Sequence, residues 1–171
     1  MKQNREKNIS KDKIEKLTFL FNQGKLLELI KEAKQLILKY PDSIFLWNIL
    51  GASNARLKKL NESEKCFYTS IKLNPNFIEG HYNLGKTQKE LGKLTEAILS
   101  YKKAIEIKPD FAKAYNNYTD SVKIQINDPI LLKLNKLINK KNLSEKDSAS
   151  LFLQWEKHNL ILETPKKVCN L

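Results

Sequence analysis

A segment of 34 residues occurs twice in direct succession in this chain, at 44–77 and 78–111. The two copies align without a gap and share ten identical positions. Five positions, three of them among the identical ones, form a pattern common to both copies: a large ring, a leucine, a glycine, an aromatic ring and a proline. They are Trp47, Leu50, Gly51, Phe67 and Pro75 in the first copy, and His81, Leu84, Gly85, Tyr101 and Pro109 in the second. Such a period indicates a stack of small units, because one unit cannot bury its apolar face alone.

The spacing of apolar residues predicts two helices in each copy. Over 44–57 these residues recur every three or four positions, as in an amphipathic helix, and a second helix follows a break at 58–61. Pro75 ends that second helix, because proline lacks the N–H that the helical ladder needs. The copy at 78–111 repeats the pattern, with a turn at Leu91-Gly92. Each copy is therefore predicted to be a helical hairpin, and the fold class to be all-α.

The same frame extends less completely to both sides. Gly24 falls at the turn of a preceding copy, and Tyr115 continues the frame after the second copy, where no matching second helix follows. Asp128-Pro129 is a typical start of another helix. The predicted organisation is an N-terminal tail at 1–9, an atypical repeat at 10–43, repeats at 44–77 and 78–111, the first helix of a further repeat or cap at 112–126, C-terminal helices at 127–158 that cap the stack, and a tail at 159–171.

The net charge of +12 is distributed evenly along the chain. Lys and Arg outnumber Asp and Glu by ten to six in 1–43, by eleven to seven in 44–111 and by ten to six in 112–171. Arginine, the preferred residue for bidentate contacts to phosphate and guanine, occurs only as Arg5 and Arg56. Specific nucleic-acid binding is therefore disfavoured, whereas weak attraction that ignores sequence remains open.

Motifs for catalysis, metals or cofactors are missing from the sequence. His81 lies at the ring position of its repeat and His158 near the end of a predicted helix, and neither has the neighbours of a zinc motif. No glycine-rich phosphate-binding loop occurs. We therefore expect no metal, no cofactor and no enzymatic activity.

Two cysteines and the first residues of the chain bear on location. Cys66 and Cys169 have no CxxC or histidine partner and are expected to be free thiols in a reducing compartment. The opening residues lack the apolar stretch of a signal peptide, and no later run approaches the roughly 18 apolar residues of a membrane span. These features predict a cytoplasmic protein without membrane contact.

The repeated pattern resembles the tetratricopeptide repeat, whose 34-residue signature runs W-x2-L-G-x2-Y, then A-x3-F, then P. The chain has WNILG at 47–51 and HYNLG at 81–85, and Ala97 and Ala104 occupy the small positions of the second copy. The resemblance implies a right-handed superhelical solenoid of antiparallel hairpins. Small residues in it let helices approach closely, and aromatic rings fill the space between them.

The resemblance further implies a concave groove, lined by the first helix of each hairpin, that binds a protein or peptide. By position, the groove residues are Phe45, Asn48, Ala52, Ala55, Arg56, Glu79, Tyr82, Asn83, Lys86, Lys89, Glu90, Lys113, Asn116, Asn117, Asp120 and Lys123. Asn83 and Asn117 lie one period apart and are expected to stack as a short amide ladder. Such amides either hold the backbone of an extended peptide or solvate the groove with no ligand.

Some members of the family clamp the C-terminal carboxylates of chaperones through five conserved side chains. By position, Asn83 and Lys113 fit two of the five places, whereas Asn48, Ala52 and Asn117 do not fit the other three. A carboxylate clamp is therefore not predicted.

Non-catalytic binding of a protein or peptide in the groove is the favoured function. An alternative comes from residues 127–153, which resemble the segment that follows the repeats in bacterial proteins with a C-terminal sulfotransferase domain. The chain lacks a sulfonate-donor loop, so this alternative implies a truncated or stand-alone repeat region of a sulfotransferase system. The third interpretation is weak nucleic-acid association through the lysine-rich surface.

Overall fold

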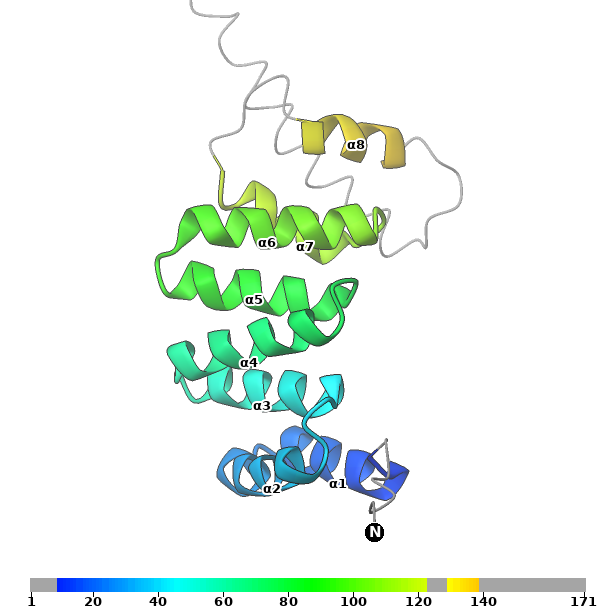
Figure 1. Ribbon diagram of the computed structural model, residues 1–171. Helices are drawn as coiled ribbons and strands as arrows, with labels where there is room; N and C mark the ends of the chain where they lie inside the picture. The colour runs from blue at the N-terminus through cyan, green and yellow to red at the C-terminus, as the bar shows by residue number, and fades with distance from the viewer. Residues whose placement is uncertain (1–8, 123–128, 139–171) are drawn as a thin grey trace, which may run out of the picture.

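The computed structural model describes residues 9–122 and 129–138 of the chain. Within these ranges all regular structure is helical, as the sequence predicts. The helices are α1 (Lys11–Asn22), α2 (Leu26–Lys39), α3 (Ile44–Arg56), α4 (Leu60–Leu73), α5 (Ile78–Glu90), α6 (Leu94–Ile107), α7 (Ala112–Thr119) and α8 (Pro129–Ile138). They form consecutive antiparallel hairpins stacked in chain order, with α1 and α2 at one end and α8 at the other (Figure 1).

A left-handed residue closes each of the first three hairpins. Gly24, Lys58 and Gly92 lie 34 positions apart and have φ angles of 71°, 59° and 78°. In each turn the next N–H bonds back to a carbonyl five positions earlier: Lys25 to Leu20 at 3.0 Å, Lys59 to Asn54 at 2.9 Å and Lys93 to Gln88 at 2.8 Å. This is the Schellman arrangement that ends a helix. Between α3 and α4 only residues 57–59 are non-helical, so α4 begins at Leu60, inside the break predicted at 58–61.

Proline-containing links join one hairpin to the next and are held by ring nitrogens. The indole Nε1 of Trp47 donates to the carbonyl oxygen of Pro41 at 2.7 Å. One period later, the imidazole Nε2 of His81 lies 2.9 Å from the carbonyl oxygen of Pro75. The histidine therefore replaces the tryptophan in the same local contact.

Two glycines allow the helices of a hairpin to pack closely around an aromatic ring. A Cβ atom added at Gly51 would lie 2.8 Å from Cε1 of Phe67, and one added at Gly85 would lie 2.6 Å from Cε1 of Tyr101. Both distances are shorter than van der Waals contact permits, so a larger residue at either position would displace the ring.

In the described ranges, the interior contains two apolar clusters with a more polar layer between them. The N-terminal cluster is built on α1–α3 around Leu17, Leu29 and Leu46. The C-terminal cluster joins α6, α7 and α8 around Tyr101 and Tyr115. Buried hydroxyl groups lie between the clusters. Two of them, Ser63 Oγ and Thr87 Oγ1, are 3.2 Å apart and form a hydrogen bond between neighbouring hairpins.

The C-terminal end differs from the expected organisation in the length of α7. Helix α7 ends at Thr119, well short of residue 126. At this end the hydroxyls of Thr119 and Ser121 donate to the carbonyls of Asn116 and Asn117 at 2.9 and 2.6 Å. Helix α8 begins at Pro129, where the sequence places the start of another helix. This start is 35 positions after that of α6 at Leu94, one position outside the 34-residue frame.

Helix α8 covers the end of the stack, where Ile130 and Leu134 are buried in the C-terminal cluster. The remainder of the predicted C-terminal helices, from residue 139, lies outside the described residues, as do the tail at 159–171 and residues 1–8 of the N-terminal tail. Among the described helices, none combines the length and apolar character that crossing a bilayer requires.

Candidate binding groove

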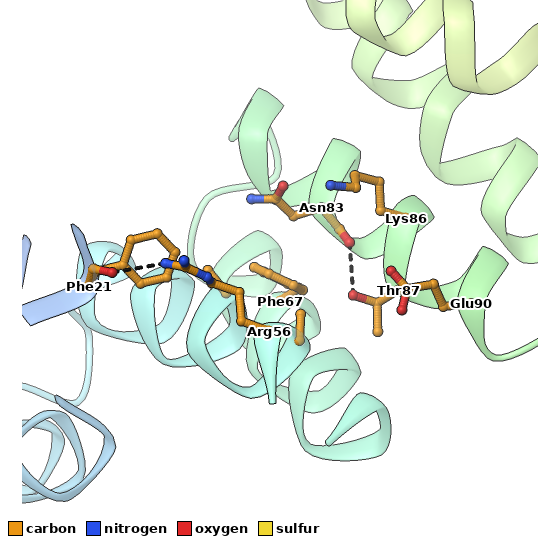
Figure 2. Close-up of a pocket in the computed structure, with 9 residues that line it drawn as sticks. Phe21, Arg56, Phe67, Asn83, Lys86, Thr87 and Glu90 are labelled. Atoms are coloured by element: carbon orange, nitrogen blue, oxygen red, sulfur yellow. Dashed lines mark hydrogen bonds between the residues drawn. The ribbon is translucent and has the colours of Figure 1, made fainter. Parts of the chain in front are cut away.

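The first helices of successive hairpins lie side by side, α1 against α3 and α3 against α5. A cavity of about 290 Å³ opens along this row. Its lining comes from α1, α3 and α5, with one ring from α4: Phe21, Ala52, Ala55, Arg56, Phe67, Asn83, Lys86, Thr87 and Glu90. Figure 2 shows Phe21 and Arg56 on one side, facing Asn83, Lys86 and Glu90 on the other. We call this space the groove cavity.

Six of the groove residues expected from the sequence lie together in this cavity: Ala52, Ala55, Arg56, Asn83, Lys86 and Glu90. Asn48 is half-buried beside them, in contact with Asn83. Other expected residues lie outside the lining: Phe45, which packs against the N-terminal cluster, and Glu79, Tyr82, Lys89, Lys113, Asn116, Asn117 and Asp120. Lys123 is outside the described residues.

Arg56 spans the first two hairpins. One guanidinium nitrogen donates to the carbonyl oxygen of Phe21 at 2.9 Å, and the guanidinium carbon lies 4.8 Å from the centre of the Phe21 ring. A cation is favourable there for two reasons: the carbonyl belongs to the last turn of α1, and the ring face attracts positive charge. The side chain is thus oriented by the protein while it remains exposed.

The groove amides do not form the expected ladder. Asn83 Nδ2 donates to Oδ1 of Asn48 at 3.4 Å, and Asn117 Nδ2 donates to the hydroxyl of Tyr82 at 3.1 Å. Each amide therefore meets the residue 35 positions earlier, not the one 34 positions earlier. Neighbouring first helices are offset by one residue at this contact, which a strict one-period frame does not represent. The prediction that Asn83 pairs with Asn117 is wrong.

Aromatic rings occupy the row between α5 and α7. The Tyr82 ring makes an edge-to-face contact with Phe111, with centroids 5.2 Å apart, and lies 6.2 Å from the Tyr101 ring. Burial raises the pKa of the Tyr82 hydroxyl, and the hydrogen bond from Asn117 partly offsets this increase. Tyr82 thus has a packing role at this position.

The charges of the groove cavity are unequally compensated. Glu90 forms an ion pair with Lys58, with Nζ and Oε2 2.7 Å apart. Within the described ranges, Arg56 and Lys86 have no carboxylate partner; Lys86 instead lies 5.9 Å from the Tyr82 ring centre. The walls of the cavity therefore carry unpaired positive charge, above an apolar lining that includes Phe21 and Phe67.

The groove positions missed three lining residues: Phe21, Thr87 and Phe67, which the sequence assigned only to packing within its hairpin. Phe21 lies 34 positions before Ala55, so extending the groove positions into the atypical first repeat would have found it. Thr87 is buried, and its hydroxyl bonds to the carbonyl of Asn83 at 3.0 Å. No groove position of the family includes Thr87, and its contribution follows only from the packing.

A second depression, of about 420 Å³, lies on the first repeat and is lined mostly by charged side chains of α2. One of its carboxylates, Glu32, is paired with Lys16 at 2.8 Å. It involves a single hairpin, so the groove cavity, which joins three hairpins, is the better candidate for a binding site.

Reactive chemistry has little support among the described residues. They contain no group of three His, Cys, Asp or Glu side chains that could hold a metal ion. Cys66 is a buried free thiol, and burial raises its pKa to about 11, which keeps it protonated and unreactive near neutral pH. Cys169 lies outside the described residues.

Sequence comparison identifies the repeated unit. Residues 46–77 and 78–111 each match a tetratricopeptide repeat profile. The peroxisomal targeting signal receptor of Candida albicans is 40% identical over 45 residues, which amount to 26% of this chain and 8% of that receptor. The chain thus corresponds to a small part of this relative.

Solved structures agree with the fold. The first TPR of Spaghetti (RPAP3), bound to the HSP90 peptide SRMEEVD, is 25% identical, with 66% of this chain and 93% of that chain covered and a TM-score of 0.62. The first TPR domain of human RPAP3 is 26% identical, with 64% and 86% covered and a TM-score of 0.62. The crystal structure of MamA is 20% identical, and the match covers 91% of this chain and 79% of the MamA chain with a TM-score of 0.61. This match bears on the fold alone. The repeated sequence, the stacked hairpins and these matches together establish the chain as a tetratricopeptide-repeat protein.

Proposed function

We propose that the chain is a non-catalytic module that binds an extended segment of a partner protein in the groove formed by its first helices. The observation that carries this proposal is the groove cavity, which joins α1, α3 and α5 and is lined by both apolar and unpaired polar side chains. Its volume of about 290 Å³ lies near the lower end for ligand pockets and suits one or two side chains. The remainder of an extended segment would run along the row of helices.

Side-chain amides make this surface suitable for a peptide backbone. Asn48 and Asn83 are joined by a long hydrogen bond of 3.4 Å. A side-chain amide has two donor hydrogens and an acceptor oxygen, so this single weak contact leaves most of their capacity available. The RPAP3 domain at 25% identity is bound to a peptide, which supports a peptide ligand for this chain as well.

The proposed partner segment differs from the peptide in that complex. Only two of the five positions of a carboxylate clamp, Asn83 and Lys113, carry suitable residues here, and Lys113 lies outside the groove cavity. We therefore expect the peptide SRMEEVD to bind weakly or not at all, which makes it a useful negative control.

The proposal is tested by selecting peptides from a random dodecamer display library on the immobilised full chain. The dissociation constants of selected peptides are then measured by fluorescence anisotropy for the wild type, Asn83→Ala and Asn61→Ala. Asn61 is exposed on α4, away from the cavity lining, and provides the matched control. We expect Asn83→Ala to weaken binding about tenfold, as loss of one to two hydrogen bonds implies, and Asn61→Ala to leave it unchanged. Equal affinities of all three proteins would contradict groove binding.

The other interpretations of the sequence remain predictions. A link to a sulfotransferase rests on residues 127–153, of which only α8 lies within the described ranges. Nucleic-acid association and a cytoplasmic location likewise have no structural observation in their favour.

A further inference from the structure

We infer that Arg56 and Lys86 form a subsite that binds the carboxylate side chain of an acidic residue in the partner segment. The inference rests on the proposed function, because it assigns the chemistry of one position of the bound peptide. It concerns an acidic side chain within the segment, held between α1, α3 and α5. The positions differ from those of a C-terminal carboxylate clamp, for which the chain lacks three of five residues.

Both cations line the same cavity from neighbouring helices, Arg56 from α3 and Lys86 from α5 (Figure 2). Arg56 is held in one orientation by its 2.9 Å bond to the Phe21 carbonyl and by the ring beneath it. A guanidinium has five N–H donors, so this bond leaves donors for a ligand. Orientation before binding also lowers the entropy that a side chain loses when it meets its ligand.

The local charge balance favours an anion. Glu90 is the one carboxylate among the cavity-lining residues, and Lys58 already neutralises it at 2.7 Å. Arg56 and Lys86 have no acidic partner within the described part of the chain, so a carboxylate entering the cavity would meet uncompensated positive charge. Electrostatic complementarity of this kind selects partners by their charge.

The apolar part of the lining favours a carboxylate on a short hydrocarbon stem. Phe21, Ala52, Ala55 and Phe67 lie beside the two cations. A glutamate or aspartate side chain combines methylene groups for these residues with a carboxylate that arginine can bind through two parallel hydrogen bonds. Inorganic anions would use only the second feature.

The test uses peptide pools in which the central position of an otherwise degenerate heptapeptide is fixed. Pools with Glu, Gln, Asp, Asn or phosphoserine at that position are titrated against the full chain. The double variants Arg56→Gln/Lys86→Gln and Lys65→Gln/Lys72→Gln lose the same charge, and the second pair lies exposed on α4. We expect the wild type and the α4 variant to bind the Glu and Asp pools about five to ten times more tightly than the Gln and Asn pools. The groove variant should bind all four pools alike.

Each alternative outcome has a distinct meaning. Equal loss of the acidic preference in both double variants would show an effect of bulk charge and overturn the subsite. Binding of the pools without acidic preference would also overturn it, while leaving groove binding intact. Preference for phosphoserine without preference for Glu would overturn the carboxylate assignment. Failure to bind any pool would contradict the proposed function itself.

Because Arg56 contacts α1, its replacement could disturb the first hairpin. The single variant Lys86→Gln avoids that contact, and it should reduce the acidic preference by about half while the circular dichroism spectrum stays unchanged. Unchanged preference in this folded variant would count against the subsite.

Discussion

The two central hairpins, residues 44–77 and 78–111, share their turns, glycines and prolines but fill the same space with different side chains. Phe67 packs against Gly51 in the first, and Tyr101 packs against Gly85 in the second. The small positions of the first are serines, Ser63 and Ser70, whereas the second has alanines. The serine hydroxyls have partners, since Ser70 Oγ donates to the carbonyl of Phe67 at 2.7 Å and Ser63 meets Thr87.

A polar contact between the two helices of each hairpin also differs. Gln88 accepts a hydrogen bond of 2.7 Å from Ser100, whereas at the corresponding positions Asn54 lies 4.0 Å from the sulfur of Cys66. The comparison indicates that the backbone of the hairpin depends on a few positions of fixed volume or conformation. Other buried positions accept polar or apolar residues as long as their volume is conserved and their hydrogen bonds are satisfied.

The strongest test of this view is to enlarge the glycines. Gly85→Val should lower the free energy of unfolding by about 3 kcal/mol, because the new side chain occupies the position of the Tyr101 ring. Gly51→Val should have a similar effect on the hairpin at 44–77. Urea denaturation followed by circular dichroism gives both values. Lys72→Val, at an exposed position of α4, controls for the helix propensity of valine. A loss below about 1 kcal/mol at Gly85 would mean that the hairpin adjusts to the added volume.

The two aromatic rings give a smaller effect of opposite sign. Within the described residues, the buried hydroxyl of Tyr101 has no hydrogen-bond partner. Tyr101→Phe introduces the residue type of Phe67, its counterpart in the hairpin at 44–77. It should raise the free energy of unfolding by about 1 kcal/mol, because a buried unsatisfied group is removed. Thermal and urea denaturation measure the change. A decrease in stability would show that the hydroxyl is satisfied in solution.

The same variant should change the response to alkaline pH. Burial raises the pKa of Tyr101 above the value of about 10 expected in the unfolded chain. The unfolded state therefore releases this proton first, and stability falls as the pH rises above 10. Tyr115 and Cys66, with pKa values raised to about 12 and about 11, act in the same direction. Tyr101→Phe should lose less stability between pH 9 and pH 11 than the wild type, as measured by urea denaturation at each pH.

The ring that holds the inter-hairpin link is expected to matter slightly less. His81→Phe removes the contact to the Pro75 carbonyl and should cost about 0.7 kcal/mol. His81→Trp introduces the residue type of Trp47, its counterpart in the hairpin at 44–77, and keeps a ring N–H. The stability of this variant should therefore equal or exceed that of the wild type. Thermal denaturation of the two variants provides the comparison. Equal stability of both would show that ring volume, and not the hydrogen bond, holds the link.

The sequence predicts the stack well and the groove contacts less well, for a physical reason. Turns, close packing and proline stops are local properties of residues such as Gly85 and Pro75, so a fixed period reveals them. The partner of Asn83 depends on how two hairpins slide past each other, which the period does not contain. The contact of Arg56 with Phe21 joins residues 35 positions apart in the same way. The early end of α7 at Thr119 is likewise a feature that the repeat frame does not represent.

The smallest expected effect concerns the turn, where the hairpin at 44–77 has Lys58 and the hairpin at 78–111 has Gly92. Lys58 adopts a φ of 59°, a conformation that costs a residue with a side chain about 1–2 kcal/mol. Lys58→Gly removes this strain but increases the freedom of the unfolded chain and breaks an exposed ion pair with Glu90 worth about 0–1 kcal/mol. The net result should be a gain of about 0.5 kcal/mol in urea denaturation. Glu90→Gln removes the ion pair without changing the turn and so separates the two contributions. If Lys58→Gly is less stable than Glu90→Gln, the left-handed turn is not strained, and the two hairpins are equivalent at this position despite their different residues.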